Sequence, residues 1–215
     1  MIFKTILLVT MFLGSNVFAQ GVCGTHSPTS SEYQFLVNYV ANLPILKNAG
    51  TTCIPIRLHI VRETNGTGGV SLDDVHEGVA YLNAYYLPAG IEFYFCGTSP
   101  NFINNSQFYD FQNSEENALA AAAGETNNAI NMYFVDEIDN TGGSSYTAGY
   151  AYTPANSVVS TRIVMRNANV AEGSTIVHEM GHHFALLHTF ETSQFFVPGM
   201  GLVGGPELVN GNNCT

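Results

Sequence analysis

Three residues in the last third of the chain have the types and the spacing that metal chemistry requires. His178 and His182 stand four positions apart, and Glu179 follows the first of them. On an α-helix, residues at i and i+4 lie about 6 Å apart along the axis and on one face, so both imidazoles can reach the same ion. A His-Glu-x-x-His pattern on a helix is typical of a hydrolytic Zn²⁺ site with the glutamate as general base. We therefore predict two Zn²⁺ ligands and a catalytic Glu179.

A hydrolytic zinc site needs a third protein ligand, and His188 is the nearest candidate. In an unbroken helix it would lie about 9 Å beyond His182 and roughly 240° around the axis, pointing away from the metal. The helix must therefore end between the two, with a sharp turn near Ala185 or Leu186. The alternative is a set of ordinary helix histidines, with His188 near a C-terminus where positive charge is favourable. His183, about 100° off the ligand face, is expected to pack and not to bind the metal.

These residues resemble the zinc signature of the metzincin metalloproteases, His-Glu-x-x-His-x-x-Gly-x-x-His. The trailing Thr189-Phe190, together with Gly181, resembles the pappalysin branch of that family. The family's glycine falls on Ala185, where a left-handed turn costs a residue with a side chain about 1 kcal/mol. The resemblance covers roughly residues 51–190 and implies a zinc endopeptidase that acts on peptide or protein substrates, with His178, His182 and His188 as its metal ligands.

The resemblance also implies an α+β fold, namely a zincin/metzincin upper subdomain. Its features are a twisted, mixed and mainly parallel sheet, a backing helix and an active-site helix. Apolar periodicity and turn residues predict strands over 52–61, 91–96, 129–135 and 162–165, and helices over 71–88 and 114–123. The strand-helix-strand unit within 52–96 predicts a parallel pair. In metzincins an antiparallel edge strand near 148–152 lines the cleft, where an extended peptide can bind as an extra strand.

The N-terminal residues 1–19 have the features of a signal peptide. Lys4 gives the positive start, residues 6–13 a short apolar run, and residues 17–19 a cleavage site of small residues. The run is too short to span a membrane, so we expect a secreted or extracytoplasmic protein without a membrane partner. Residues 20–50 are expected to form a short pre-segment or pro-peptide, with a helix that begins near Ser30. Residues 51–215 are expected to form the catalytic domain.

The charge balance excludes several classes of partner. Without Lys4, five basic side chains remain against seventeen acidic ones. Such an acidic chain argues against binding to nucleic acid or to anionic membranes. With 46% hydrophobic residues in just under 200 positions after the leader, one domain with a sizeable core is expected. We expect it to be a monomer.

Four cysteines, Cys23, Cys53, Cys96 and Cys214, occur in a chain that is expected to be exported, so disulfides are permitted. None forms a Cys-x-x-Cys pair, which argues against a cysteine zinc site. Cys53 and Cys96 lie at the ends of two neighbouring predicted strands and are the best candidates for a bridge. Cys23 begins a Cys-Gly-Thr run that resembles the cysteine blocking the zinc in some metzincin zymogens, so it is a candidate zymogen switch. Pairing of Cys23 with Cys214 is the alternative.

The resemblance ends early. Metzincins continue beyond the third histidine into a lower subdomain with a methionine turn beneath the zinc, and nothing after His188 matches it. Met200, twelve residues on and between glycines, is a poor candidate. We therefore expect an incomplete lower subdomain. Two other functions stay open: a zincin whose third ligand is a downstream glutamate, Glu207, and an inactive binding module that zinc stabilises.

Overall fold

The computed structural model describes residues 20–42, 50–97, 100–140, 142, 145–154, 158–188, 195–197 and 201–203. Seven strands form the main sheet: β1 (Gln20–Cys23), β2 (Thr52–Arg62), β3 (Ile91–Phe95), β4 (Asn101–Asn104), β6 (Ile130–Val135), β8 (Ser145–Ala151) and β9 (Arg162–Arg166). Their order is β1-β8-β9-β6-β2-β3, with β4 beside the second half of β2. All of these pairs are parallel except the antiparallel pair of β8 and β9. The sheet is therefore mixed and mainly parallel, as predicted.

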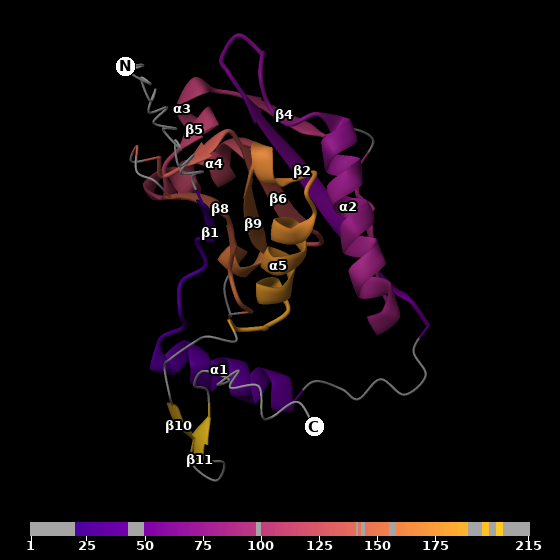
Figure 1. Ribbon diagram of the computed structural model, residues 1–215, viewed down its shortest axis with the longest axis vertical. Helices are drawn as coiled ribbons and strands as arrows, with labels where there is room; N and C mark the ends of the chain where they lie inside the picture. Colours follow the sequence, from indigo (N-terminus) through magenta and orange to yellow (C-terminus); the bar gives the residue numbers. More distant parts are fainter. Residues whose placement is uncertain are drawn as a thin grey trace, which may run out of the picture.

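Helices cover both faces of the sheet. On one face, α2 (Leu72–Tyr86) and α5 (Ser174–His183) lie side by side (Figure 1). The other face carries α3 (Ser106–Tyr109) and α4 (Glu116–Ala123). The helix predicted near Ser30 is α1 (Ser30–Ala41). The smaller elements are η1 (Leu87–Ala89), β5 (Asp110–Phe111), η2 (Asn113–Glu115), β7 (Glu137–Ile138), η3 (Val158–Thr161), η4 (Asn167–Asn169), β10 (Phe195–Val197) and β11 (Gly201–Val203).

The strands and helices form where the sequence predicts them for local reasons. The Ser71 side chain accepts a hydrogen bond from the Asp74 backbone N at 3.1 Å and so caps the start of α2. Gly90, with φ of 74°, then turns the chain into β3. The parallel pairing of β2 with β3 confirms the predicted strand-helix-strand unit.

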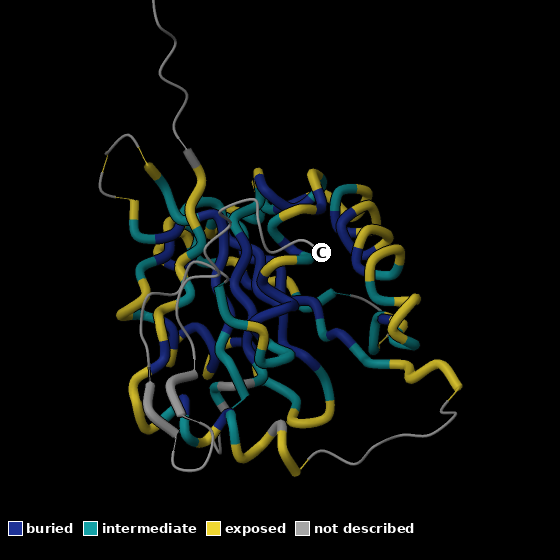
Figure 2. The backbone as a smooth tube through the Cα atoms, turned by 60° about the horizontal axis from the view of Figure 1, so that its bottom comes forward, coloured by how far each residue is buried: buried dark blue, intermediate teal, exposed yellow. Residues whose placement is uncertain are grey.

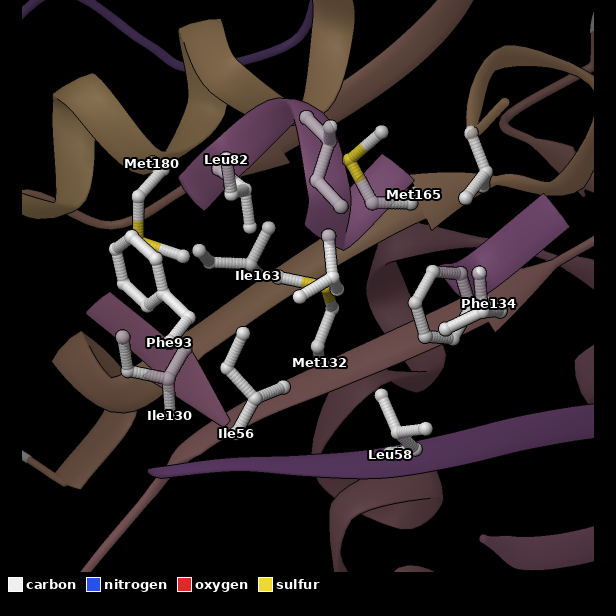
Figure 3. Close-up of a cluster of buried hydrophobic side chains, with 14 of the residues drawn as sticks. Ile56, Leu58, Leu82, Phe93, Ile130, Met132, Phe134, Ile163, Met165 and Met180 are labelled. Atoms are coloured by element: carbon white, nitrogen blue, oxygen red, sulfur yellow. The ribbon is translucent and has the colours of Figure 1, made fainter. Parts of the chain in front are cut away.

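Alternation along the strands separates the interior into two cores. Ile56, Leu58 and Ile60 of β2 point toward α2 and α5, whereas Val61 points toward α3 and α4. Figure 3 shows side chains of the first core converging from the strands and from both helices, with Leu82 supplied by α2 and Met180 by α5. Burial is greatest along the central strands and falls on the outer side of the helices (Figure 2). The first core therefore fixes α5 against the sheet.

The predicted disulfide between Cys53 and Cys96 is wrong, because both thiols are free. In the parallel pair, Cys53 lies opposite Glu92, near the start of each strand, and Cys96 follows the end of β3. Cys96 is four residues beyond Glu92, so the two cysteines are about 13 Å apart along the strand direction, far beyond the reach of a disulfide. The cysteines lie on neighbouring strands but at opposite ends of them.

Several predictions fall on residues outside the described part of the chain. These are the signal peptide, the residues Thr189-Phe190 and Met200, and Glu207 and Cys214. Among the described residues, no helix has both the length and the apolar composition that crossing a membrane requires.

Candidate active site

The helix that carries the His-Glu-x-x-His pattern ends at His183, between the second and third histidines. Ala185 has φ of 69°. This is the left-handed conformation expected of the glycine that the metzincin signature has at this position. The Leu186 backbone N donates to the Gly181 carbonyl at 2.9 Å, a bond characteristic of a Schellman helix end. The chain therefore reverses where the sequence predicts a turn, although an alanine makes it.

The reversal brings three imidazoles together. The Nε2 atom of His188 lies 3.3 Å from Nε2 of His178 and 3.1 Å from Nε2 of His182. The Nε2 atoms of His178 and His182 are 3.1 Å apart. Cys23 Sγ completes the cluster at 3.5 Å from His182 Nε2, and all four ligand atoms lie within 4.8 Å of one another. A tetrahedral Zn²⁺ with ligand distances of about 2.0–2.3 Å separates its ligands by about 3.3–3.6 Å, so the spacing of the three Nε2 atoms fits a zinc coordination shell, and so does the distance from Cys23 Sγ to His182 Nε2.

The hydrogen bonding of His182 agrees with a metal ligand. Its Nδ1 lies 2.7 Å from the Leu186 carbonyl oxygen, which only accepts, so Nδ1 carries the proton. Nε2 is then left with its lone pair, and it is this atom that faces the other two histidines. Burial lowers the pKa of His182 to about 4, which keeps the ring neutral. Neutral imidazole is the form that binds a metal ion, and a carbonyl bonded to the second nitrogen orients it.

Glu179 lies beside this cluster and is fully buried. Its Oε2 accepts a hydrogen bond from the Thr25 hydroxyl at 2.9 Å and from the Cys23 thiol at 3.7 Å. Within the described part of the chain, Oε1 is buried and has no hydrogen-bond partner. Burial is the main cause that raises the pKa of Glu179, to about 7. A carboxyl group with a pKa near neutrality is suited to both accepting and returning a proton.

The N-terminal segment 20–25 occupies the edge of the sheet next to these groups. β1 pairs with β8 in parallel, from Gln20 opposite Ser145 to Cys23 opposite Gly149. The contact continues beyond β1, because Gly24 N donates to the Gly149 carbonyl at 2.8 Å. The Thr25 hydroxyl accepts from Ala151 N at 2.9 Å. The edge strand predicted to bind a peptide is antiparallel to its neighbour β9, as expected, but residues 20–25 of the same chain cover its free edge.

Sequence reasoning identified Cys23 but missed Thr25 and the strand before it. Four residues are too few to show the alternation by which a strand is recognised. A signal was available in the Cys-Gly-Thr run itself. A Cβ on Gly24 would lie 2.6 Å from Cγ2 of Thr147, so only glycine allows the approach that places Cys23 and Thr25 on either side of it.

Two hollows flank the histidines. One, of about 260 Å³, lies between β1 and α5 and is lined by Cys23, Ala148, Thr175, His178 and Glu179, among others. The second, of about 320 Å³, lies between the end of α2 and the turn after α5. Tyr86, Val177 and Leu186 line it together with the three histidines. The cluster is thus accessible from two sides even though Glu179 and His182 are buried.

The chain is similar in sequence to extracellular metalloproteases of fungi. No protein-family model matches the chain. It is 27% identical over 214 residues to an extracellular metalloprotease of Colletotrichum graminicola, a match that covers 89% of this chain and 73% of that protein. It is 29% identical over 167 residues to an extracellular metalloprotease of Pyricularia oryzae, covering 70% of this chain and 56% of that one. The crystal structure of metalloproteinase-II from Bacteroides fragilis aligns with a TM-score of 0.40 and 13% identity, over 69% of this chain and 49% of that one.

Proposed function

We propose that this protein is a secreted zinc endopeptidase of the pappalysin-like metzincin type, which its own N-terminal segment keeps inactive. In this proposal His178, His182 and His188 hold Zn²⁺ and Glu179 is the general base. The observation that carries the proposal is the set of three Nε2 atoms, 3.1–3.3 Å from one another, beside a buried carboxylate. The similarity to extracellular metalloproteases supports the same class and a secreted location.

The residues of this chain divide the reaction between them. A bound Zn²⁺ supplies Lewis acidity, which makes water acidic near neutral pH and polarises a peptide carbonyl. Glu179 accepts the proton of the attacking water and donates it to the leaving amine. The β8 edge offers backbone groups to an extended peptide, so recognition through the substrate backbone is expected.

The proposed latency has three parts within six residues. Burial, and then the charge of Glu179, raise the pKa of Cys23 to about 11, so without a cation its thiol stays protonated. As a thiolate, Cys23 would be a further ligand for a metal ion held by the histidines, and it would then take the place of the attacking water. The Thr25 hydroxyl bonds to the general base. β1 fills the strand edge where the substrate would lie.

Zinc content tests the ligand set. The purified protein is expected to contain about one zinc ion per chain by mass spectrometry of the metal. His182→Ala should lose it, whereas the neighbouring His183→Gln should retain it. His188→Ala and Glu207→Gln separate the proposed third ligand from the rival one. Zinc that survives His188→Ala but not Glu207→Gln would overturn the three-histidine assignment.

Hydrolysis tests the enzyme and its latency. Casein hydrolysis should be low in the intact protein and rise when residues 20–50 are removed by limited proteolysis, or when Cys23 is replaced by alanine. Loss of that activity in Glu179→Gln, with zinc retained, would establish the base. A zinc-loaded protein that stays inactive after removal of the segment would instead support the binding-module alternative.

A further inference from the structure

Backbone pairing differs between the two halves of the edge strand β8. Its last three residues, 149–151, pair with β9, whereas residues 145–147 pair only with β1 among the described strands. When the N-terminal segment leaves, one antiparallel neighbour remains, along three residues. Backbone pairing alone is therefore a poor means of holding this strand at a fixed distance from the zinc helix.

A second support comes from the opposite face of the sheet. The hydroxyls of Tyr150 and Tyr152 both donate to Glu116 Oε2, at 2.7 Å and 2.8 Å. Glu116 belongs to α4 and is 7% exposed. Its other oxygen, Oε1, accepts a hydrogen bond from Arg162 at 2.8 Å. One carboxylate thus joins a helix to the end of β8 and to the start of β9.

The Glu116 carboxylate lies beside a buried cation that is itself well anchored. Arg162 is 5% exposed and bonds Glu125 through two nitrogens, at 2.6 Å and 3.0 Å, so the guanidinium is itself held firmly. A buried carboxylate without a cation would be strongly unfavourable, and Arg162 supplies one. Burial and the charge of Glu116 raise the pKa of both tyrosines, which therefore remain hydrogen-bond donors.

The residues on either side of Tyr150 lie close to the catalytic machinery. A Cβ on Gly149 would lie 3.2 Å from Cγ of Glu179, which shows how closely the strand approaches the base. Ala151 is the residue whose backbone N is bonded to Thr25, in the place where a substrate would be recognised. Because side chains alternate across a strand, the tyrosine hydroxyls reach Glu116 on the α4 face, whereas Gly149 presents its Cβ position to Glu179 on the α5 face.

We propose that Glu116 is a positioning residue for substrate binding. Through its hydrogen bonds with Tyr150 and Tyr152 it fixes the position of β8, at the edge of the cleft, relative to Glu179. This inference rests on the proposed function, because it takes β8 as the strand that binds the peptide. It assigns Glu116 no contact with the substrate and no part in proton transfer.

The test compares hydroxyl deletions on and off the edge strand. The double variant Tyr150→Phe/Tyr152→Phe keeps both rings and removes the two hydrogen bonds to Glu116, one from β8 and one from the residue after it. Tyr133→Phe is the matched control, because its hydroxyl donates to Glu125 in the same network at 2.9 Å but belongs to β6. Glu116→Gln is a third variant, which keeps an oxygen acceptor and removes the charge.

Two measurements decide the outcome. In the protein freed of residues 20–50, the double variant and Glu116→Gln should raise KM for an extended peptide about tenfold while kcat changes less than about twofold. Amide hydrogen exchange over residues 145–152 of the intact zinc-loaded protein should be faster in these variants than in Tyr133→Phe. Unchanged exchange over β8, or the same KM in the control as in the double variant, would overturn the inference.

The exchange measurement keeps this inference separate from the function on which it rests. If the unmodified protein hydrolyses no peptide, the proposed function fails. Exchange over β8 still shows whether Glu116 holds the strand, because it needs no turnover. If hydrolysis is normal and the double variant lowers kcat without raising KM, the positioning role is wrong while the protease assignment stands.

Discussion

Two carboxylates are buried on opposite faces of one sheet, and their surroundings differ. On the α4 face, Glu116 receives two tyrosine hydroxyls on one oxygen and Arg162 on the other. On the α5 face, Glu179 has Thr25 and the Cys23 thiol on one oxygen, both from the N-terminal segment. The other oxygen of Glu179 has no hydrogen-bond partner in the described residues.

The difference separates a carboxylate that supports the fold from one that is kept for chemistry. A buried carboxylate is tolerable when it is paired with a cation and fully hydrogen-bonded, as Glu116 is. Among the described residues Glu179 has no arginine or lysine partner, and burial raises its pKa to about 7. A perturbed carboxyl group beside a cluster of three histidines is the pattern expected of a catalytic group. Removal of the N-terminal segment would leave Glu179 free to act while Glu116 keeps every contact.

The largest expected effect is on hydrolysis, and it should follow Glu179 alone. In the protein freed of residues 20–50, Glu179→Gln should lower kcat/KM by at least about 1,000-fold, because no other described carboxylate takes its place as general base. Glu116→Gln should lower kcat/KM by no more than about tenfold, through KM. Peptide hydrolysis at matched zinc content measures both. Equal losses in the two variants would remove the distinction between the faces.

The second effect is on stability, and it should follow Glu116. Replacing Glu116 by leucine leaves two buried tyrosine hydroxyls without their acceptor and Arg162 with one carboxylate in place of two. We expect the free energy of unfolding to fall by about 3 kcal/mol. Glu179→Gln should change it by less than about 1 kcal/mol, because it removes a carboxyl group that burial already disfavours. Urea denaturation of the two variants, with zinc removed, makes the comparison.

The sequence predicts the site on the α5 face well, because the residues that form it are close together in the chain. Spacing at i and i+4 puts two histidines on one helical face, and helix geometry requires a turn before His188. The structure contains that turn, at Ala185. The mainly parallel sheet was also predictable, because apolar alternation and the strand-helix-strand order are properties of short windows.

The α4 face was not predictable, because its contacts join distant residues. Glu116 lies 34 positions from Tyr150 and 46 from Arg162, and sequence patterns do not give the register that brings them together. The wrong prediction of a disulfide between Cys53 and Cys96 has the same cause, because the sequence did not give the register of β2 against β3. Likewise, nothing in a four-residue strand predicts that β1 pairs with β8.

A smaller effect concerns the bond between the N-terminal segment and the base. Thr25→Val keeps the shape of the side chain and removes the hydroxyl that donates to Glu179. Because a hydrogen bond to a charged group contributes about 1.5 kcal/mol, the unprocessed protein should become about tenfold more active. Thr29→Val is the control, since that hydroxyl bonds to Glu32 at 2.7 Å, away from the histidines. Equal activation by both variants would show general loosening of the segment.

The smallest effect extends the comparison to a third buried titratable group, His59 on the α4 face, for which the sequence predicts only a core or surface histidine. It is fully buried. Its Nε2 lies 3.1 Å from the Asn131 amide oxygen, and the Asn101 amide donates to Nδ1 at 3.0 Å. Both ring nitrogens are therefore satisfied only in the neutral form. Burial accordingly lowers the pKa of His59.

The sign of the pH dependence follows from proton uptake. As pH falls below about 6.5, the unfolded chain protonates this histidine and the folded chain does not, so stability falls. Above that pH the contribution is constant. The free energy of unfolding of zinc-free protein, measured at pH 7.5 and 5.5, should therefore fall more in the unmodified protein than in His59→Gln, by at most about 1.4 kcal/mol per pH unit. An equal fall in both would place the acid sensitivity elsewhere than His59, because this substitution leaves every other titrating group in place.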